Sequence, residues 1–89
     1  MEIVLEPDLS HCIQTKARME YDRVTRELLA AEEKTILVSQ RLEILRSFLE
    51  STDFVKLRRQ YESYLVEGKK VRFTLRAAAG ATEYVIEVT

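Results

Sequence analysis

Apolar residues recur at every third or fourth position through the first half of the chain, from residue 17 to residue 49. The spacing alternates between four and three, and a single polar residue interrupts it. The positions are Ala17, Tyr21, Val24, Leu28, Ala31, Thr35, Val38, Leu42, Leu45 and Leu49. A period of 3.5 is typical of a coiled coil, and neither Gly nor Pro falls inside the pattern. We therefore predict a long coiled-coil helix over about residues 9–50, roughly 60 Å long at 1.5 Å per residue.

A straight helix of that length cannot bury its apolar seam against itself, so the pattern predicts a homo-oligomer, most simply a dimer. The expected oligomer interface consists of Tyr21, Val24, Leu28, Ala31, Val38, Leu42, Leu45 and Leu49. The charges beside the seam favour antiparallel helices. A parallel pair sets Glu27 against Glu32, whereas an antiparallel pair brings Glu27 to Arg41 of the other copy.

A second, shorter helix is predicted over about residues 53–67. Residues 51–53 are Ser, Thr and Asp, which prefer helix caps to helix interiors, and Gly68 stops the apolar pattern. Folded back, this helix would cover the long helix from about Leu37 to Phe48. A second apolar row lies there, made of Leu29, Ile36, Leu37, Ile44 and Phe48. One continuous helix through residue 67 is the alternative.

From residue 69 onward the pattern changes to a period of two, which predicts a β-hairpin with strands at about 70–76 and 83–88. Pairing residues whose numbers sum to 159 sets Phe73 opposite Ile86 and Arg72 opposite Glu87, a favourable register on both faces. Residues 2–6 are a possible third strand. The expected fold class is α+β, mainly α. We expect one domain, 1–89, with the long helix as its oligomerisation element and residues 51–89 forming the short helix and hairpin.

The composition is that of a folded chain, with 46% apolar and 33% charged residues among 89. Cys12 is the only cysteine, which excludes an internal disulfide and favours a reducing compartment. Residues 1–5 lack the basic and long apolar stretches of a signal peptide, and no apolar run approaches the ~20 residues that span a bilayer. We therefore expect a cytoplasmic protein with no membrane partner.

Asp8, His11 and Cys12 are the most concentrated group of chemically versatile side chains. A structural zinc site usually needs four Cys or His ligands, and a Cys–His nucleophile needs a third group and an oxyanion site. None of these is present nearby in the sequence. We therefore expect no catalytic residue, no metal site and no cofactor, and we interpret the chain as a non-enzyme.

Basic residues concentrate in residues 54–76, which hold seven basic and two acidic side chains, whereas residues 1–53 have a net charge of −4. The basic residues are Lys56, Arg58, Arg59, Lys69, Lys70, Arg72 and Arg76. They could contact nucleic acid or an acidic protein, although the neighbouring aromatic residues occupy core positions and are poorly placed to stack on bases. We favour a non-enzymatic protein-interaction or assembly module that oligomerises through the long helix. A small dimeric nucleic-acid-binding regulator using residues 54–76 is the alternative.

Overall fold

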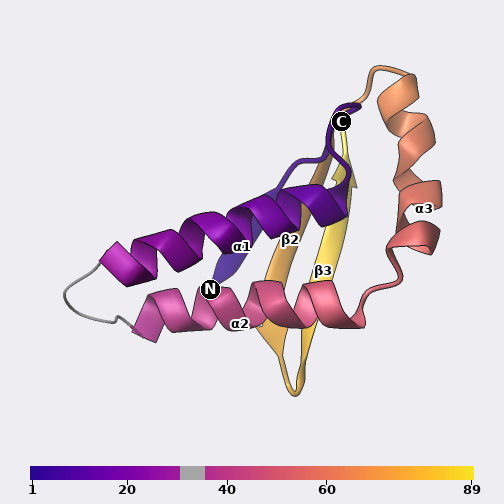
Figure 1. Cartoon of the computed structure of the whole chain (residues 1–89). Coiled ribbons are helices and arrows are strands. Elements are labelled where there is room, and N and C mark those ends of the chain that lie inside the picture. The colour runs from indigo at the N-terminus through magenta and orange to yellow at the C-terminus, as the bar shows by residue number, and fades with distance from the viewer. Residues whose placement is uncertain (31–35) are drawn as a thin grey trace.

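A computed structural model gives the structure of the protein and describes residues 1–30 and 36–89. The predictions for Ala31 and Thr35 therefore lie outside the described residues. The elements are β1 (Glu2–Leu5), α1 (Ile13–Ala30), α2 (Ile36–Ser51), α3 (Phe54–Val66), β2 (Val71–Ala78) and β3 (Ala81–Val88). They form an α+β fold, in which the helices pack on one face of an antiparallel sheet (Figure 1).

The sheet has the order β1-β2-β3, and both pairs of strands are antiparallel. Phe73, at the centre of β2, lies between Leu5 of β1 and Ile86 of β3. The predicted register of the hairpin and the predicted third strand are both confirmed. The chain reverses between β2 and β3 at Gly80, which has a φ of 77°, a conformation that L side chains rarely adopt.

The helix-facing side of the sheet forms the core. Its buried residues are Ile3, Leu5, Val71, Phe73 and Leu75. Alternation along each strand turns the intervening residues to the opposite face, which is exposed. The core is completed from the helices by Ile13, Ala17, Val24, Ile44, Leu45, Phe48, Leu57 and Tyr61.

The prediction of one long helix over residues 9–50 is wrong. Helices α1 and α2 contact each other and run antiparallel as a helical hairpin (Figure 1). The apolar seam is present in both halves, so when the chain reverses direction, one half can cover the other. Covering the seam within one chain avoids the entropy that is lost when two copies associate. The antiparallel pairing expected between two copies is therefore found inside one.

The first helix also begins later than predicted, at Ile13. The carboxylate of Asp8 caps a turn that precedes the helix. Its Oδ1 accepts hydrogen bonds from the backbone N–H of Ser10 at 2.8 Å and of His11 at 2.7 Å. The carbonyl oxygen of Cys12 then accepts the first helical bond, from the N–H of Lys16 at 3.0 Å. Asp8 holds the approach to α1 rather than the helix itself.

The predicted short helix and the break before it are confirmed by α3. Asp53 caps its start, where Oδ1 accepts a hydrogen bond from the N–H of Lys56 at 3.2 Å. Helix α3 does not fold back along α2, however. It packs against β2, where the rings of Tyr61 and Phe73 are 5.5 Å apart, and against the start of α1, where the Tyr61 hydroxyl accepts a bond from the N–H of Ile13 at 2.9 Å.

The second apolar row of α2 is covered by the sheet, which explains why α3 lies elsewhere. The Thr82 hydroxyl of β3 donates a hydrogen bond to the carbonyl oxygen of Ile44 at 3.0 Å, and the rings of Phe48 and Tyr84 are 5.7 Å apart. The other residues of the row, Leu29 near the end of α1 and Ile36 and Leu37 at the start of α2, stay exposed.

Candidate functional site

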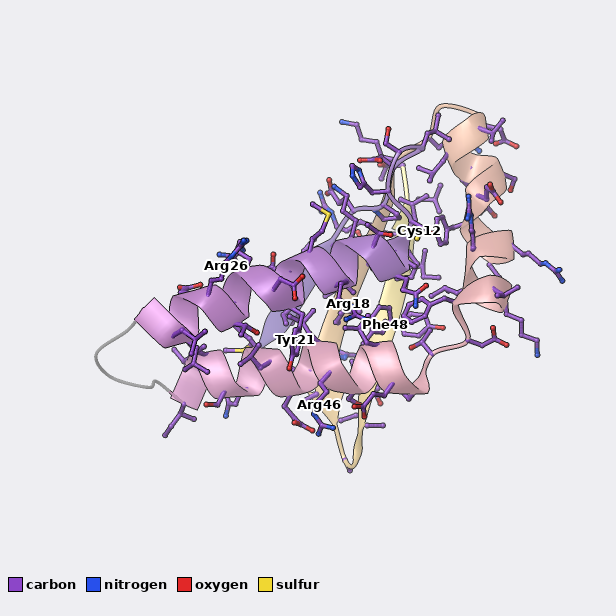
Figure 2. All side chains as sticks on the ribbon, in the orientation of Figure 1. Cys12, Arg18, Tyr21, Arg26, Arg46 and Phe48 are labelled. Carbon is purple, nitrogen blue, oxygen red and sulfur yellow. The ribbon has the colours of Figure 1, made fainter. Side chains whose placement is uncertain are left out.

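The residues predicted to form an oligomer interface lie between α1 and α2 of one chain. Val24 and Leu45 are fully buried there. Tyr21, Leu28, Val38, Leu42 and Leu49 are half-buried, and Ala31 lies outside the described residues. Figure 2 shows Tyr21 between the two helices. Packing inside the chain therefore covers the apolar seam for which a second copy was predicted.

The seven basic residues predicted as a nucleic-acid or acidic-partner surface are divided by the structure. Lys56, Arg58 and Arg59 lie on α3, on the helical side of the sheet. Arg72 and Arg76 lie on the opposite, exposed face of the sheet and pair with Glu6 at 3.1 Å and Glu83 at 3.4 Å. Lys69 and Lys70 lie in the loop between these groups.

The group at Asp8, His11 and Cys12 is a turn and a helix start. A hydrogen bond from the N–H of His11 lowers the pKa of the Asp8 carboxyl. Burial raises the pKa of the Cys12 thiol, but contacts with Thr15 and the helix start outweigh it, so the net shift is downward. Across residues 1–30 and 36–89, no three His, Cys, Asp or Glu side chains are grouped so that they could hold a metal ion.

The edge of the sheet at β1 is open. Lys70 and Thr89 exchange both backbone hydrogen bonds, at 2.9 Å each. In an antiparallel sheet, the backbone groups of successive residues face opposite neighbouring strands, so Lys70 and every second residue after it bond to β3. The N–H and C=O groups of Phe73 and Leu75 must then face β1, where they meet Leu5 and Ile3. By the same alternation, the N–H and C=O of Val4 point away from the sheet. No hydrogen bond joins either group to any described residue.

A groove of about 1140 Å³ runs alongside this open edge, and we call it the β1 groove. One wall is the chain from Val4 to Ser10, and the other is one face of α1. That face contributes Lys16, Met19, Glu20, Arg23 and Arg26, which recur at helical spacing. Leu65 and residues 68–71 also line the groove. Figure 2 shows Arg26 on the side of α1 away from α2.

The groove exists because the helical hairpin is longer than the sheet is wide. Helix α1 has 18 residues and is therefore roughly 27 Å long at 1.5 Å per residue. Three strands spaced about 4.8 Å apart put only about 10 Å between the axes of β1 and β3. In Figure 1 the hairpin crosses the strands and extends well past β1.

Three large apolar side chains that line the groove are exposed. Val4 is 54% exposed and Leu9 74% on one wall, and Met19 is 49% exposed on the other. Single exposed apolar residues are ordinary, but several of them lining one groove favour a binding surface.

The charges of the groove leave a positive excess. The acidic side chains are mostly occupied, since Asp8 lies 3.5 Å from Lys16 and Glu6 pairs with Arg72. A hydrogen bond from Arg23 lowers the pKa of Glu20 and holds it as a charged partner. Among the lining residues without an ion pair to any described residue are two bases, Arg26 and Lys70, and one acid, Asp22.

Sequence reasoning did not find this groove, because a groove between elements arises from tertiary packing. Two weak signals were present. Val4 alternates with Ile3 and Leu5, so it had to lie on the other face of its strand. Met19 lies outside the apolar seam of the first helix, although it is a large apolar residue.

Comparison with known proteins places the chain in a family. A protein-family model matches residues 1–87, so the chain belongs to that family. A protein of Archaeoglobus fulgidus, described as an uncharacterized protein, is 40% identical over 62 residues, which cover 67% of this chain and 72% of the relative. No solved structure matches significantly. Neither match states an activity, so the functional argument rests on the geometry of the β1 groove.

Proposed function

We propose that the protein is a non-enzymatic protein-interaction module that holds a segment of another protein in the β1 groove. One observation carries this proposal. The open backbone edge at Val4 borders the β1 groove, whose other wall exposes the apolar side chain of Met19. An edge strand is a ready template for another chain, and natural proteins usually cover such an edge or place charges on it. Here the exposed residues along the edge are Glu2, Val4 and Glu6, so Val4 is an uncharged position between two acidic ones.

The alternative of a nucleic-acid-binding regulator receives less support. Phosphate binding benefits from several bases on one surface, whereas Arg72 and Arg76 lie on the opposite side of the sheet from α3. Both arginines also have carboxylate partners. The groove offers backbone hydrogen-bonding groups and apolar area, which suit a polypeptide better than a phosphate backbone.

Photo-cross-linking in the native host tests this proposal. A photoreactive amino acid replaces Met19 on the wall of the groove, and a matched chain carries it at Val55, which is 67% exposed on α3. We expect a protein to be cross-linked from position 19 and not from position 55. The captured protein, once purified, should bind the natural chain and lose affinity for Met19→Lys. Equal cross-linking from both positions, or unchanged affinity for Met19→Lys, would contradict docking in the groove.

Two sequence predictions remain as secondary proposals. A homo-oligomer is tested by sedimentation of the full chain at tens of micromolar, where a mass of 10.4 kDa would identify a monomer. A cytoplasmic location is tested by fractionation of the native host. No helix in the described parts of the chain is long and apolar enough to cross a membrane.

A further inference from the structure

We infer that the occupant of the β1 groove is an extended polypeptide segment that adds a fourth strand to the open edge of β1, with aliphatic residues at its centre and no acidic residue opposite Glu2 or Glu6. This inference rests on the proposed function and goes further, because docking in the groove alone does not specify the conformation or composition of the partner.

The outward backbone groups of Val4 favour an extended partner. The N–H and C=O of Val4 face the groove, and no described residue pairs with them. A helical partner uses its own backbone groups internally and cannot pair with them, whereas an extended chain can pair with both. Strand addition also requires free space about 4.8 Å from β1, and the groove lies along that side of the strand.

The side chains of the groove select aliphatic residues for the centre of the partner. A residue opposite Val4 would share its face of the sheet, where aliphatic and β-branched neighbours stabilise cross-strand pairs. The adjacent residues of the added strand would point to the other face, toward α1, where Met19 is half-exposed. Both faces of the added strand would therefore meet apolar surface near Val4.

The charges restrict where acidic residues of the partner can lie. Arg26 lies near the end of α1, and Lys70 lies just before β2, so the two bases belong to different parts of the groove wall. Neither has an ion pair with a described residue, and Asp22 is the one lining acid in the same state. Acidic residues of the partner would therefore suit only its face toward α1, because Glu2 and Glu6 flank Val4 on the exposed face of the sheet and would repel acids set opposite them.

A random linear peptide library displayed on phage provides the probe, and the full-length chain is the target. We expect enrichment of peptides with a central aliphatic or β-branched run. The affinity of a selected synthetic peptide is then compared between the natural chain and three variants. Val4→Pro removes the outward N–H, Val4→Ala keeps that N–H while shortening the side chain, and Met19→Lys alters the opposite wall.

We expect Val4→Pro to weaken binding about tenfold, and Val4→Ala to weaken it much less. The proline breaks no bond within the sheet, because Ile3 and Leu5 make the bonds to β2. Should Val4→Pro not fold, NMR on the natural chain decides instead. Strand addition predicts nuclear Overhauser effects between the amide proton of Val4 and the backbone of the peptide.

The outcomes separate this inference from the proposed function. Sensitivity to Met19→Lys without sensitivity to Val4→Pro, or without contacts at the Val4 amide, would mean that the groove docks proteins but not by strand addition. Peptides that bind equally to all variants would contradict both proposals. A selection that enriches no peptide, or enriches only peptides without an aliphatic run, would overturn the inference about the occupant, while the cross-link from position 19 would still test docking itself.

Discussion

Replacing Phe73 by alanine is the sharpest test of the fold that supports the groove. Phe73 is fully buried at the centre of β2. Its ring meets Tyr61 of α3 at 5.5 Å in an edge-to-face arrangement and Tyr84 of β3 at 5.8 Å. It therefore links the sheet to α3, and its removal leaves a cavity that two large rings cannot easily fill.

The expected cost of Phe73→Ala is about 3–5 kcal/mol in the free energy of unfolding, the usual range for a buried phenylalanine. For a chain of 89 residues, each 1 kcal/mol lowers the melting temperature by about 4–8 °C, so the change should exceed 10 °C. Urea denaturation followed by circular dichroism measures the free energy directly. A small domain has only about 5–15 kcal/mol in total, so the variant should be close to unfolding.

Arg76→Ala is the matched control on the same strand. Arg76 is exposed and pairs with Glu83 at 3.4 Å, so its loss should cost at most about 1 kcal/mol. A cost below about 1 kcal/mol for Phe73→Ala, together with a larger one for Arg76→Ala, would mean that the two faces of the sheet are reversed. The exposed side of β1 and the position of the groove would then be wrong as well.

Further substitutions test other contacts of the fold. Tyr61→Phe should cost about 1–3 kcal/mol in urea denaturation, because the buried N–H of Ile13 loses its acceptor; no change would contradict that bond. Asp53→Ala should cost about 0.5–2 kcal/mol through loss of the cap of α3, and full stability would show that the cap is not formed. Leu45→Asp should lower the melting temperature without changing the sedimentation mass of the folded chain, because Leu45 is buried inside one chain. If the substitution instead dissociated an oligomer, the apolar seam would be an interface between copies. Burial raises the pKa of the Tyr61 hydroxyl. The contribution of this hydroxyl to the free energy of unfolding is therefore fully present below about pH 10, its ordinary pKa, and is lost as the pH rises through the pKa of the folded state. Denaturation between pH 8 and 11 should show this loss in the natural chain and a smaller one in Tyr61→Phe.

The elements that local patterns determine were predictable. The hairpin register followed from alternation, because a one-residue shift would bury Arg72 and expose Phe73. The start of α3 followed from residues 51–53, whose side chains prefer caps. The strand at residues 2–6 was identified by its apolar alternation before Pro7.

The arrangement of the helices was not predictable in the same way. An apolar seam with a period of 3.5 shows that a helix needs a partner helix. The pattern is the same whether that partner belongs to another copy or to the same chain. The destination of α3 was equally hidden, since Tyr61 could have packed on α2 as well as on Phe73. The β1 groove depends on the length of α1 relative to the width of the sheet, which no local pattern reports.

Hydrogen exchange at two backbone amides tests whether an extended segment docks at the edge of β1. The N–H of Val4 faces the open edge at β1, and by the same alternation the N–H of Ile86 faces the open edge at β3. Both should exchange rapidly in the free chain. With a selected peptide bound, we expect exchange to slow at least tenfold at Val4 and to stay unchanged at Ile86. Unchanged exchange at Val4, or slowing at Ile86 alone, would contradict docking of an extended segment in the β1 groove.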